Sequence, residues 1–342
     1  MDQILKICWY ADDEISNFGD DLNRWLWRRL PGFPAEVDDG TLLLGIGTVI
    51  GLGFVPFAKK YVVLSSGIGY EAPPLGFGGP KWQILSVRGP LTAAVLNLPA
   101  EKAITDGAVL LRLLAECQPL PESQRNGIAF MPHYESLPDG NWRQVCAAAG
   151  FDFLDPLADS EETVQRIRNA KLVVADAMHA AIVADTLRVP WIPVVLSPRT
   201  NTFKWLDWTL SLRLPYCPVR VPASTLLELV RNVSHRFTGK SHFLKNRSMS
   251  NAILHYRRVM RLTSWKYWPY LRRRLHFAYV VPKRIITAPA FSTIKKWLDE
   301  RLTYRAAKKL RSVAEMPAYL SDEQLLLSKF QQLASMLPKI QP

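Results

Sequence analysis

The sequence has few cysteines and no apolar run long enough to suggest a membrane span. Its four cysteines, Cys8, Cys117, Cys146 and Cys217, are scattered and form no CxxC pair, so reduced structural thiols are expected rather than disulfides or zinc ligands. The longest uncharged run, residues 40–58, is interrupted by glycines and a proline, which favours a strand and a loop over a span of about 20 residues. The N-terminus lacks a basic segment and a long apolar core, which predicts a cytoplasmic protein.

Several well-known catalytic and nucleotide-binding motifs are also absent. There is no G-x-G-x-x-G followed by a suitable acidic residue and no G-x-x-x-x-G-K-[ST], which argues against a dinucleotide site and a P-loop. The G-x-S-x-G elbow of serine hydrolases and the H-E-x-x-H pair of zinc peptidases are missing as well. No spacing typical of metal ligands is present, so neither a metal nor another cofactor is expected.

Carboxylates are almost absent from one long stretch. Residues 231–312 contain 21 Lys and Arg but only Asp299 and Glu300, whereas the whole chain has a net charge of +13. Residues 264–284 mix tryptophan and tyrosine with these cations, a composition typical of segments at a membrane interface. We therefore expect residues 231–312 to meet an anionic membrane surface. A solvated basic helix and a protein-binding face are the alternatives, and no recognised module supports nucleic acid binding.

What is present is an alternation of strand and helix signals. It predicts a first α/β unit at residues 1–118 and a second at 119–222, joined by the polar, proline-containing segment 119–126. Residues 223–342 form a basic, aromatic and mainly helical extension. Strands that end in glycine or polar residues and alternate with helices favour doubly wound parallel sheets, and two such units suggest a cleft between them.

The stretch "KLVVADAMHAAIVADTLRVPWIPVVLS" (171–197) gives the sharpest local prediction. It indicates a buried strand at 171–175, a helix at 178–187 with Asp176 as its N-cap, and a second strand at 191–196. His179 then lies in the first turn of a helix at the carboxyl end of a strand, where open α/β sheets bind ligands and a helix dipole favours anions. The alternative is a structural histidine that caps the turn.

Polar residues recur at the predicted strand ends. Each has a structural explanation of its own, such as capping a helix, ending a strand or pairing on the surface, and only their shared location favours ligand binding. These candidates are Asn17, Asp20, Asp21, Arg88, Asp106, His133, Tyr134 and His179.

Seven short motifs follow one another along the first two thirds of the chain. They are "NFGDDLN" (17–23), "LGIGT" (44–48), "SSGIG" (65–69), "SVRGPLT" (86–92), "ITDGAVLL" (104–111), "MPHY" (131–134) and "ADAMHAAIVADTLRVP" (175–190). In this order they resemble the polysaccharide pyruvyl transferases, closest to their bacterial exopolysaccharide branch. The segment "FKWLDW" (203–208) also resembles the succinoglycan-type members, and the resemblance covers roughly residues 5–215.

The resemblance implies two Rossmann-like domains in a glycosyltransferase B-like arrangement. It also implies transfer of pyruvate from phosphoenolpyruvate onto two hydroxyls of one sugar, which gives a cyclic ketal. The acceptor would be an oligosaccharide on a lipid carrier, and the enzyme would lie peripherally on the cytoplasmic face of the inner membrane. A nucleotide-sugar glycosyltransferase with the same architecture is the main rival, and a non-catalytic assembly protein is the second.

The resemblance further implies that Arg88 and His179 hold the donor. One departure matters, because the arginine often found two residues before the histidine is Ala177 here. Another cation must then bind phosphate, and Lys204 is favoured over Arg199 and Arg188.

The chemistry of ketal formation completes the predicted site. Protonation of the enol carbon calls for an acid near neutral pH, for which His179 is the first candidate and His133 the second. Asp20 or Asp106 would act as base toward the acceptor hydroxyl. The predicted acceptor-binding residues are Asn17, Asp20, Asp21, Asp106 and Tyr134.

Overall fold

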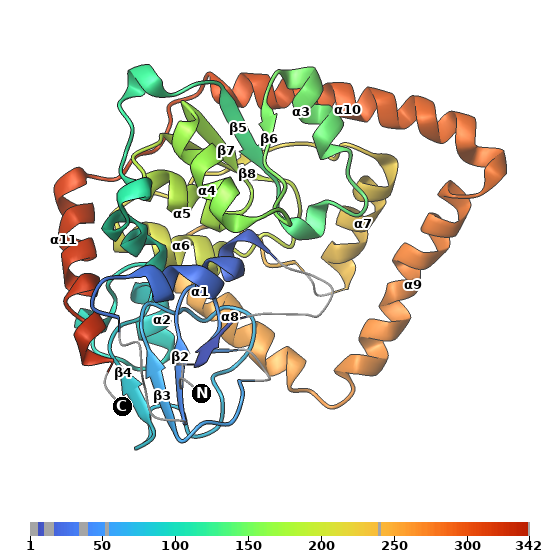
Figure 1. Cartoon of the computed structure of the whole chain (residues 1–342). Coiled ribbons are helices and arrows are strands. Elements are labelled where there is room, and N and C mark those ends of the chain that lie inside the picture. Colours follow the sequence, from blue (N-terminus) through green and yellow to red (C-terminus); the bar gives the residue numbers. More distant parts are fainter. Residues whose placement is uncertain (1–5, 10–16, 34–39, 52–54, 239–240, 341–342) are drawn as a thin grey trace.

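The computed structural model describes residues 6–9, 17–33, 40–51, 55–238 and 241–340. It is an α/β protein with two parallel sheets and a set of helices that follows them in the chain (Figure 1). All four cysteines are free in the structure, and Cys217 alone among them is exposed. None of the described helices is both long and apolar enough to cross a membrane.

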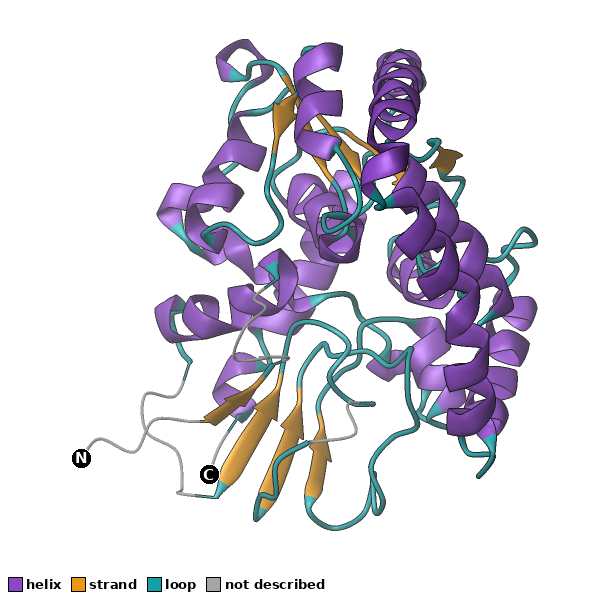
Figure 2. Ribbon diagram, turned by 90° about the vertical axis from the view of Figure 1, so that its right-hand side faces the viewer, coloured by secondary structure: helices purple, strands orange, loops and turns teal. Residues whose placement is uncertain are grey.

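The first sheet has four parallel strands in the order β1-β2-β3-β4 (Figure 2). Helix α1, Phe18–Arg29, connects β1 to β2, and α2, Pro90–Val95, follows β4. The prediction that strands of this unit end in glycine-containing segments is confirmed for β2 and β3. The described residues between β2 and β4 contain no helix, and glycine-rich loops make these connections. The strands are β1 Lys6–Cys8, β2 Thr41–Leu44, β3 Lys60–Val63 and β4 Trp82–Ile84.

The second sheet has five parallel strands in the order β6-β5-β7-β8-β9. In a doubly wound sheet of this order, the chain reverses direction between β5 and β7, and ligands bind at the carboxyl ends of those two strands. The strands are β5 Ile128–Met131, β6 Asp152–Phe153, β7 Leu172–Ala175, β8 Trp191–Val195 and β9 Val219–Arg220. The helices between them are α3 Trp142–Ala149, α4 Ser160–Asn169, α5 Met178–Thr186 and α6 Thr202–Ser211.

The β-α-β unit predicted for residues 171–197 is confirmed as β7, α5 and β8. Its predicted cap is wrong: the N-cap of α5 is Ala177, and no side chain caps the helix. The Asp176 carboxylate instead accepts hydrogen bonds from the backbone N–H groups of His133 and Leu196. Asp176 therefore ties the ends of β5, β7 and β8 together.

The helices beyond residue 222 pack back onto both sheet units. Helix α10 lies against α3, and α11 lies against a 3-10 segment of the first unit, Gly107–Leu113. Ala306 and Leu310 of α10 are fully buried in the core of the second sheet. The domain boundaries predicted at residues 118 and 222 remain predictions. These helices are α7 Leu226–Phe237, α8 Met249–Thr263, α9 Trp268–Ile286, α10 Ser292–Ala314 and α11 Glu323–Ala334.

Short 3-10 helices occupy several of the connections. Apart from Gly107–Leu113, they are Ala100–Lys102, Ala115–Cys117, Glu122–Gln124, Tyr134–Ser136, Pro289–Phe291 and Leu337–Lys339.

Candidate active site

A cleft of about 520 Å³ lies between the two sheet units. Residues that follow the strands of the first sheet, such as Thr48 and Tyr70, line one side of it. His133 and Asp176, which follow β5 and β7 at the reversal point of the second sheet, line the other. The carboxyl ends of both sheets therefore face a common space, as the two-unit organisation predicts.

Three helices begin at this cleft. Phe18 opens α1, Met178 opens α5, and Asn201 is the N-cap of α6; all three line the cleft. The first N–H groups of a helix lack intrahelical partners, and the aligned peptide dipoles leave a partial positive charge there. This arrangement favours an anionic ligand, and phosphate groups bind at such helix ends in many proteins.

His179 lies in the first turn of α5 and faces the first unit. Its Nε2 atom is 3.8 Å from Oδ2 of Asp106, and neither atom has a hydrogen-bond partner. A Cβ atom on Gly19 would lie 1.8 Å from His179 Nδ1, so only glycine at that position leaves room for the imidazole. Burial, followed by the charges of Lys204 and Arg88, lowers the pKa of His179 to about 3. The imidazole is therefore neutral at neutral pH.

Lys204 projects from the first turn of α6 into the cleft. Its ammonium donates a hydrogen bond to the Tyr70 hydroxyl at 3.2 Å, and its stem passes Gly69, where a Cβ atom would approach the lysine Cγ to 2.8 Å. Burial and the neighbouring Arg88 charge lower the Lys204 pKa to about 8. The cation is therefore kept in place against a desolvation cost, which a bound anion would offset.

The other charges at the cleft are mostly compensated. Arg199 forms an ion pair with Glu135, and Asp20 accepts a hydrogen bond from the Asn17 amide. Burial raises the pKa of Asp20 to about 6, so this carboxylate is ionised at neutral pH and protonated in mild acid. Among the described residues, Lys204 is the cleft-lining cation without an ion-pair partner.

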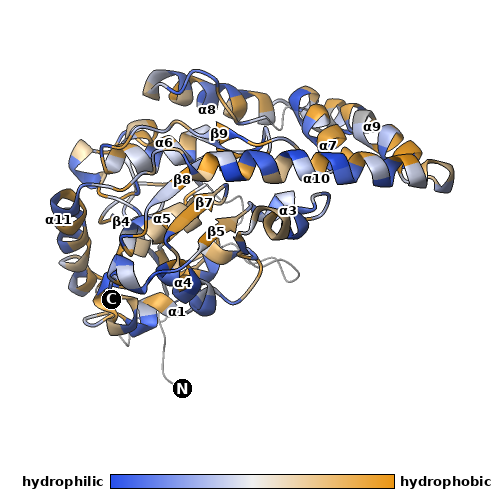
Figure 3. Cartoon of the chain, turned by 90° about the horizontal axis from the view of Figure 1, so that it is seen from above, coloured by the Kyte–Doolittle hydropathy of each residue, from blue (hydrophilic) through white to orange (hydrophobic). Residues whose placement is uncertain are grey.

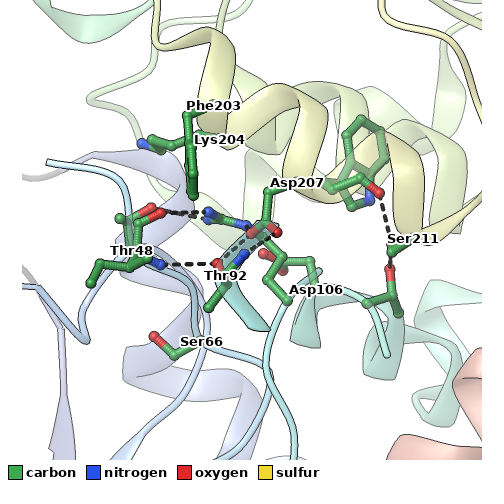
Figure 4. Close-up of polar contacts among 12 residues, drawn as sticks. Thr48, Ser66, Thr92, Asp106, Phe203, Lys204, Asp207 and Ser211 are labelled. Atoms are coloured by element: carbon green, nitrogen blue, oxygen red, sulfur yellow. Dashed lines mark hydrogen bonds and ion pairs between the residues drawn. The ribbon is translucent and has the colours of Figure 1, made fainter. Parts of the chain in front are cut away.

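Arg88 lies beneath the cleft and is fully buried. Its Nε atom donates to Asp207 Oδ2 at 3.0 Å, and its Nη1 atom donates to the Thr48 hydroxyl at 3.0 Å. Asp207, on α6 one turn from Lys204, also accepts hydrogen bonds from the Thr92 N–H and hydroxyl (Figure 4). A Cβ atom on Gly67 would lie 2.4 Å from the guanidinium. Arg88 thus joins the loops of the first sheet to the helix that carries Lys204.

The structure brings six of the nine predicted site residues into the cleft and leaves three outside it. Asp21 pairs with Arg24 on α1, Arg88 is buried with Asp207, and Asp106 caps the 3-10 segment by accepting from the Ala108 N–H. Their predicted direct contact with substrate has no geometric support, because none of the three lines the cleft. The six that line it are Asn17, Asp20, His133, Tyr134, His179 and Lys204.

The structure also bears on which cation could take the place of the missing arginine. Arg188 pairs with Glu323 and Ser321 and does not line the cleft, and the charge of Arg199 is compensated by Glu135. Ala177, at the departure from the motif, does line the cleft together with Lys204. Lys204 therefore remains the best candidate for the missing arginine.

Sequence reasoning missed Tyr70, Glu135 and Asp207. Tyr70 directly follows the glycine-rich "SSGIG" motif, and Glu135 directly follows "MPHY", so extending each motif by one residue finds both. Asp207 stands inside the quoted "FKWLDW" segment, but no local pattern shows that it pairs with Arg88, 119 residues earlier in the chain. Within the described part of the chain, no group of three or more His, Cys, Asp or Glu could hold a metal ion.

Comparison with known proteins identifies the family. The model of the polysaccharide pyruvyl transferase family matches residues 111–198, which include His133 and His179. The succinoglycan biosynthesis protein ExoV of Rhizobium meliloti (strain 1021) is 43% identical over 221 residues, which cover 64% of this chain and 69% of that protein. This chain belongs to the polysaccharide pyruvyl transferase family. It is accordingly a transferase, as the order of its motifs predicts, and the rival of a non-catalytic assembly protein is not supported.

Proposed function

We propose that this pyruvyl transferase moves the pyruvyl group of phosphoenolpyruvate onto two hydroxyls of one sugar in an exopolysaccharide repeat unit. The observation that carries the proposal is that Lys204 lies with the N-terminal ends of α5 and α6 beside a neutral, partly buried His179. A small donor that carries a phosphate and a carboxylate needs such a set of positive groups.

In the proposed reaction, the donor's enol carbon takes up a proton and becomes a methyl group. The adjacent carbon becomes oxocarbenium-like, and one sugar hydroxyl attacks it. The bond between this carbon and the oxygen that bridges it to phosphorus then breaks, and inorganic phosphate leaves with that oxygen. A second hydroxyl of the same sugar attacks in turn and closes the cyclic ketal. The sugar hydroxyls lose two protons: one restores the proton that the enzyme's acid gave to carbon, and the other leaves on the inorganic phosphate.

His179 is the proposed proton donor. Its pKa near 3 leaves the imidazole unprotonated at neutral pH in the absence of substrate. A bound donor would bring negative charge beside His179, raise that pKa and allow the imidazolium to form. Asp106, whose unpartnered oxygen faces His179 Nε2 at 3.8 Å, would stabilise the resulting imidazolium from behind. Asp106 is thus proposed as a positioning residue instead of the acceptor base.

Asp20 is the proposed base toward the acceptor hydroxyl. It lines the cleft near the start of α1, and its pKa of about 6 makes it a carboxylate that can accept a proton at neutral pH. Asn17 and Tyr134 line the same cleft and would bind sugar hydroxyls. His133 remains the second candidate for proton transfer.

The pH dependence of the reaction offers a test of Lys204. We expect kcat/KM for phosphoenolpyruvate to rise through about pH 6 as Asp20 ionises and to fall above about pH 8 as Lys204 loses its proton. The donor's own phosphate also ionises near pH 6, so the alkaline limb is the diagnostic one. Arginine stays charged throughout this range, and Lys204→Arg should therefore move the alkaline limb to higher pH. An alkaline limb that stays in place in the variant would remove Lys204 from donor binding.

The acceptor and location are proposed from the relative. ExoV is described as a succinoglycan biosynthesis protein, and we infer that this chain modifies a succinoglycan-type repeat unit while that unit is attached to a lipid carrier. The enzyme would then work peripherally at the cytoplasmic face of the inner membrane. We further propose that the two sheet units are Rossmann-like domains in a glycosyltransferase B-like arrangement, with the donor bound by the second.

Mass spectrometry of a lipid-linked oligosaccharide tests this function directly. Incubation with phosphoenolpyruvate should add one pyruvyl ketal per acceptor and release one inorganic phosphate. The same acceptor with a UDP-sugar should gain nothing. Gain of a hexose from the UDP-sugar, with no reaction from phosphoenolpyruvate, would favour the rival glycosyltransferase.

A further inference from the structure

Helix α9 has two apolar sides, and the protein covers only one of them. The inner side contains Trp268 and Ile286, which are 8% and 7% exposed, and α9 packs against α7. On this side Tyr279 also donates a hydrogen bond to Asp139, which in turn pairs with Arg231 of α7. The inner contacts account for how the helix is held at the edge of the molecule (Figure 1).

The outer side of α9 carries an apolar stripe that faces solvent. Tyr270, Phe277, Val281 and Ile285 are spaced seven, four and four residues apart, which places them along one side of an α-helix. Their exposed fractions are 74%, 62%, 51% and 60%. We call these four residues the outer stripe. Burying such aromatic and aliphatic side chains against an apolar surface would be favourable, so the outer stripe is suited to contact with a partner.

Arginines flank the outer stripe. Arg273, Arg274 and Arg284 are exposed, and their positions in the helix place them beside Tyr270, Phe277 and Val281. No carboxylate occurs between residues 241 and 294, and none of these three arginines forms an ion pair with another described side chain. The outer stripe and its arginines therefore combine exposed apolar side chains with uncompensated positive charge. Figure 3 shows hydrophobic and hydrophilic residues side by side along α9.

We propose that the outer stripe and its arginines dock this protein onto an anionic lipid bilayer, with α9 lying in the plane of the interface. Such helices bury their apolar side at the boundary between headgroups and acyl chains while cations pair with anionic lipids. Tyr270 suits headgroup depth, and the 19 residues of α9 give a contact of about 28 Å. A nucleic acid would use the arginines but would gain nothing from Val281 and Ile285, so the bilayer fits both features.

Helix α9 is linked to the cleft through its neighbour α8. Helix α8, which precedes α9, packs on α6, and its Tyr256 donates to the backbone of Glu71 at the cleft. Docking through α9 would thus keep the cleft near the membrane. The benefit of a cleft held near the membrane rests on the proposed function, because it assumes a lipid-linked acceptor. The docking of α9 onto a bilayer does not rest on that function.

Sedimentation of the full chain with vesicles tests the docking without donor or acceptor. We expect capture by vesicles of phosphatidylcholine and phosphatidylglycerol and little capture by phosphatidylcholine alone. The variant Arg273→Gln/Arg274→Gln/Arg284→Gln should bind about 100-fold more weakly at low salt, since each basic residue contributes about 1 kcal/mol near an anionic surface and 1.4 kcal/mol is tenfold. The variant Phe277→Ser/Val281→Ser/Ile285→Ser should lose the capture that persists at high salt.

Leu75→Ser is the matched control, because Leu75 is fully exposed in the first unit, far along the chain from α9, and should bind vesicles like the wild type. All substituted side chains are exposed, so the variants should keep the wild-type unfolding midpoint and full activity on a soluble acceptor. Wild-type vesicle binding by the serine variant would overturn the proposal. Duplex DNA binding that only the arginine variant loses, or a dimer that the serine variant dissolves, would overturn it in favour of a nucleic acid or a second copy.

Discussion

Replacing His179 by alanine is expected to lower kcat for ketal formation by about 100-fold to 10,000-fold, the range that a positioned acid or base contributes. His179 stands at the start of α5 and lines the cleft, and its Nε2 atom is 3.8 Å from the unpartnered carboxylate oxygen of Asp106. Alanine removes the imidazole but keeps the helix, whose other contacts are unchanged. The rate of phosphate release with saturating phosphoenolpyruvate and acceptor measures the effect.

Two further variants make this result specific to the site. His276→Ala removes an exposed histidine of α9 and should leave kcat unchanged. Gly19→Ala adds a methyl group that would collide with His179 Nδ1, so it should reduce kcat even though His179 is still present. A well-folded His179→Ala enzyme with near-normal turnover would falsify the proposed role.

Replacing Asp207 by asparagine is expected to cost about 3–5 kcal/mol of the free energy of unfolding, because the buried Arg88 guanidinium would lose its charged partner. Both side chains of this pair are 0% exposed, and the pair joins the first unit to α6. Urea unfolding followed by circular dichroism gives the difference. The remaining folded enzyme should show a raised KM for phosphoenolpyruvate, since α6 carries Lys204.

A surface pair supplies the control for Asp207. Asp155 and Arg143 form an ion pair of 3.2 Å with side chains 32% and 72% exposed, and such pairs contribute about 0–1 kcal/mol. Asp155→Asn should therefore barely change the unfolding midpoint and should leave KM as it is. Equal losses of stability in the two variants would mean that the Arg88–Asp207 pair does not hold the two units together.

The predictions that held depend on short stretches of sequence. The apolar run at 171–175, the alanine-rich segment after it and Pro190 are enough to specify β7, α5 and the turn to β8, because strand and helix periods are local properties. The same argument placed His179 in the first turn of its helix.

The predictions that failed concern partners distant in the chain. Asp176 looks like a helix cap in its own segment, yet its oxygens bind the N–H groups of His133 and Leu196 on neighbouring strands. The Arg88 guanidinium, expected at a strand end, donates hydrogen bonds to Asp207 and Thr48, which the sequence did not indicate, and its role in donor binding stays a prediction. Neither partner follows from local spacing, because the packing of the two units decides which groups meet.

The sequence by itself determined the family, the strand-end positions of the polar residues and the basic, aromatic character of the last third of the chain, since motif order, periodicity and charge are written in the residues. The tertiary structure alone decided which of those residues share the cleft. It buried Arg88 with Asp207, set Asp106 behind His179 and left Lys204 as the uncompensated cation of the cleft among the described residues. The physical reason is that burial and electrostatic pairing depend on distances in space, which the order of residues along the chain does not fix.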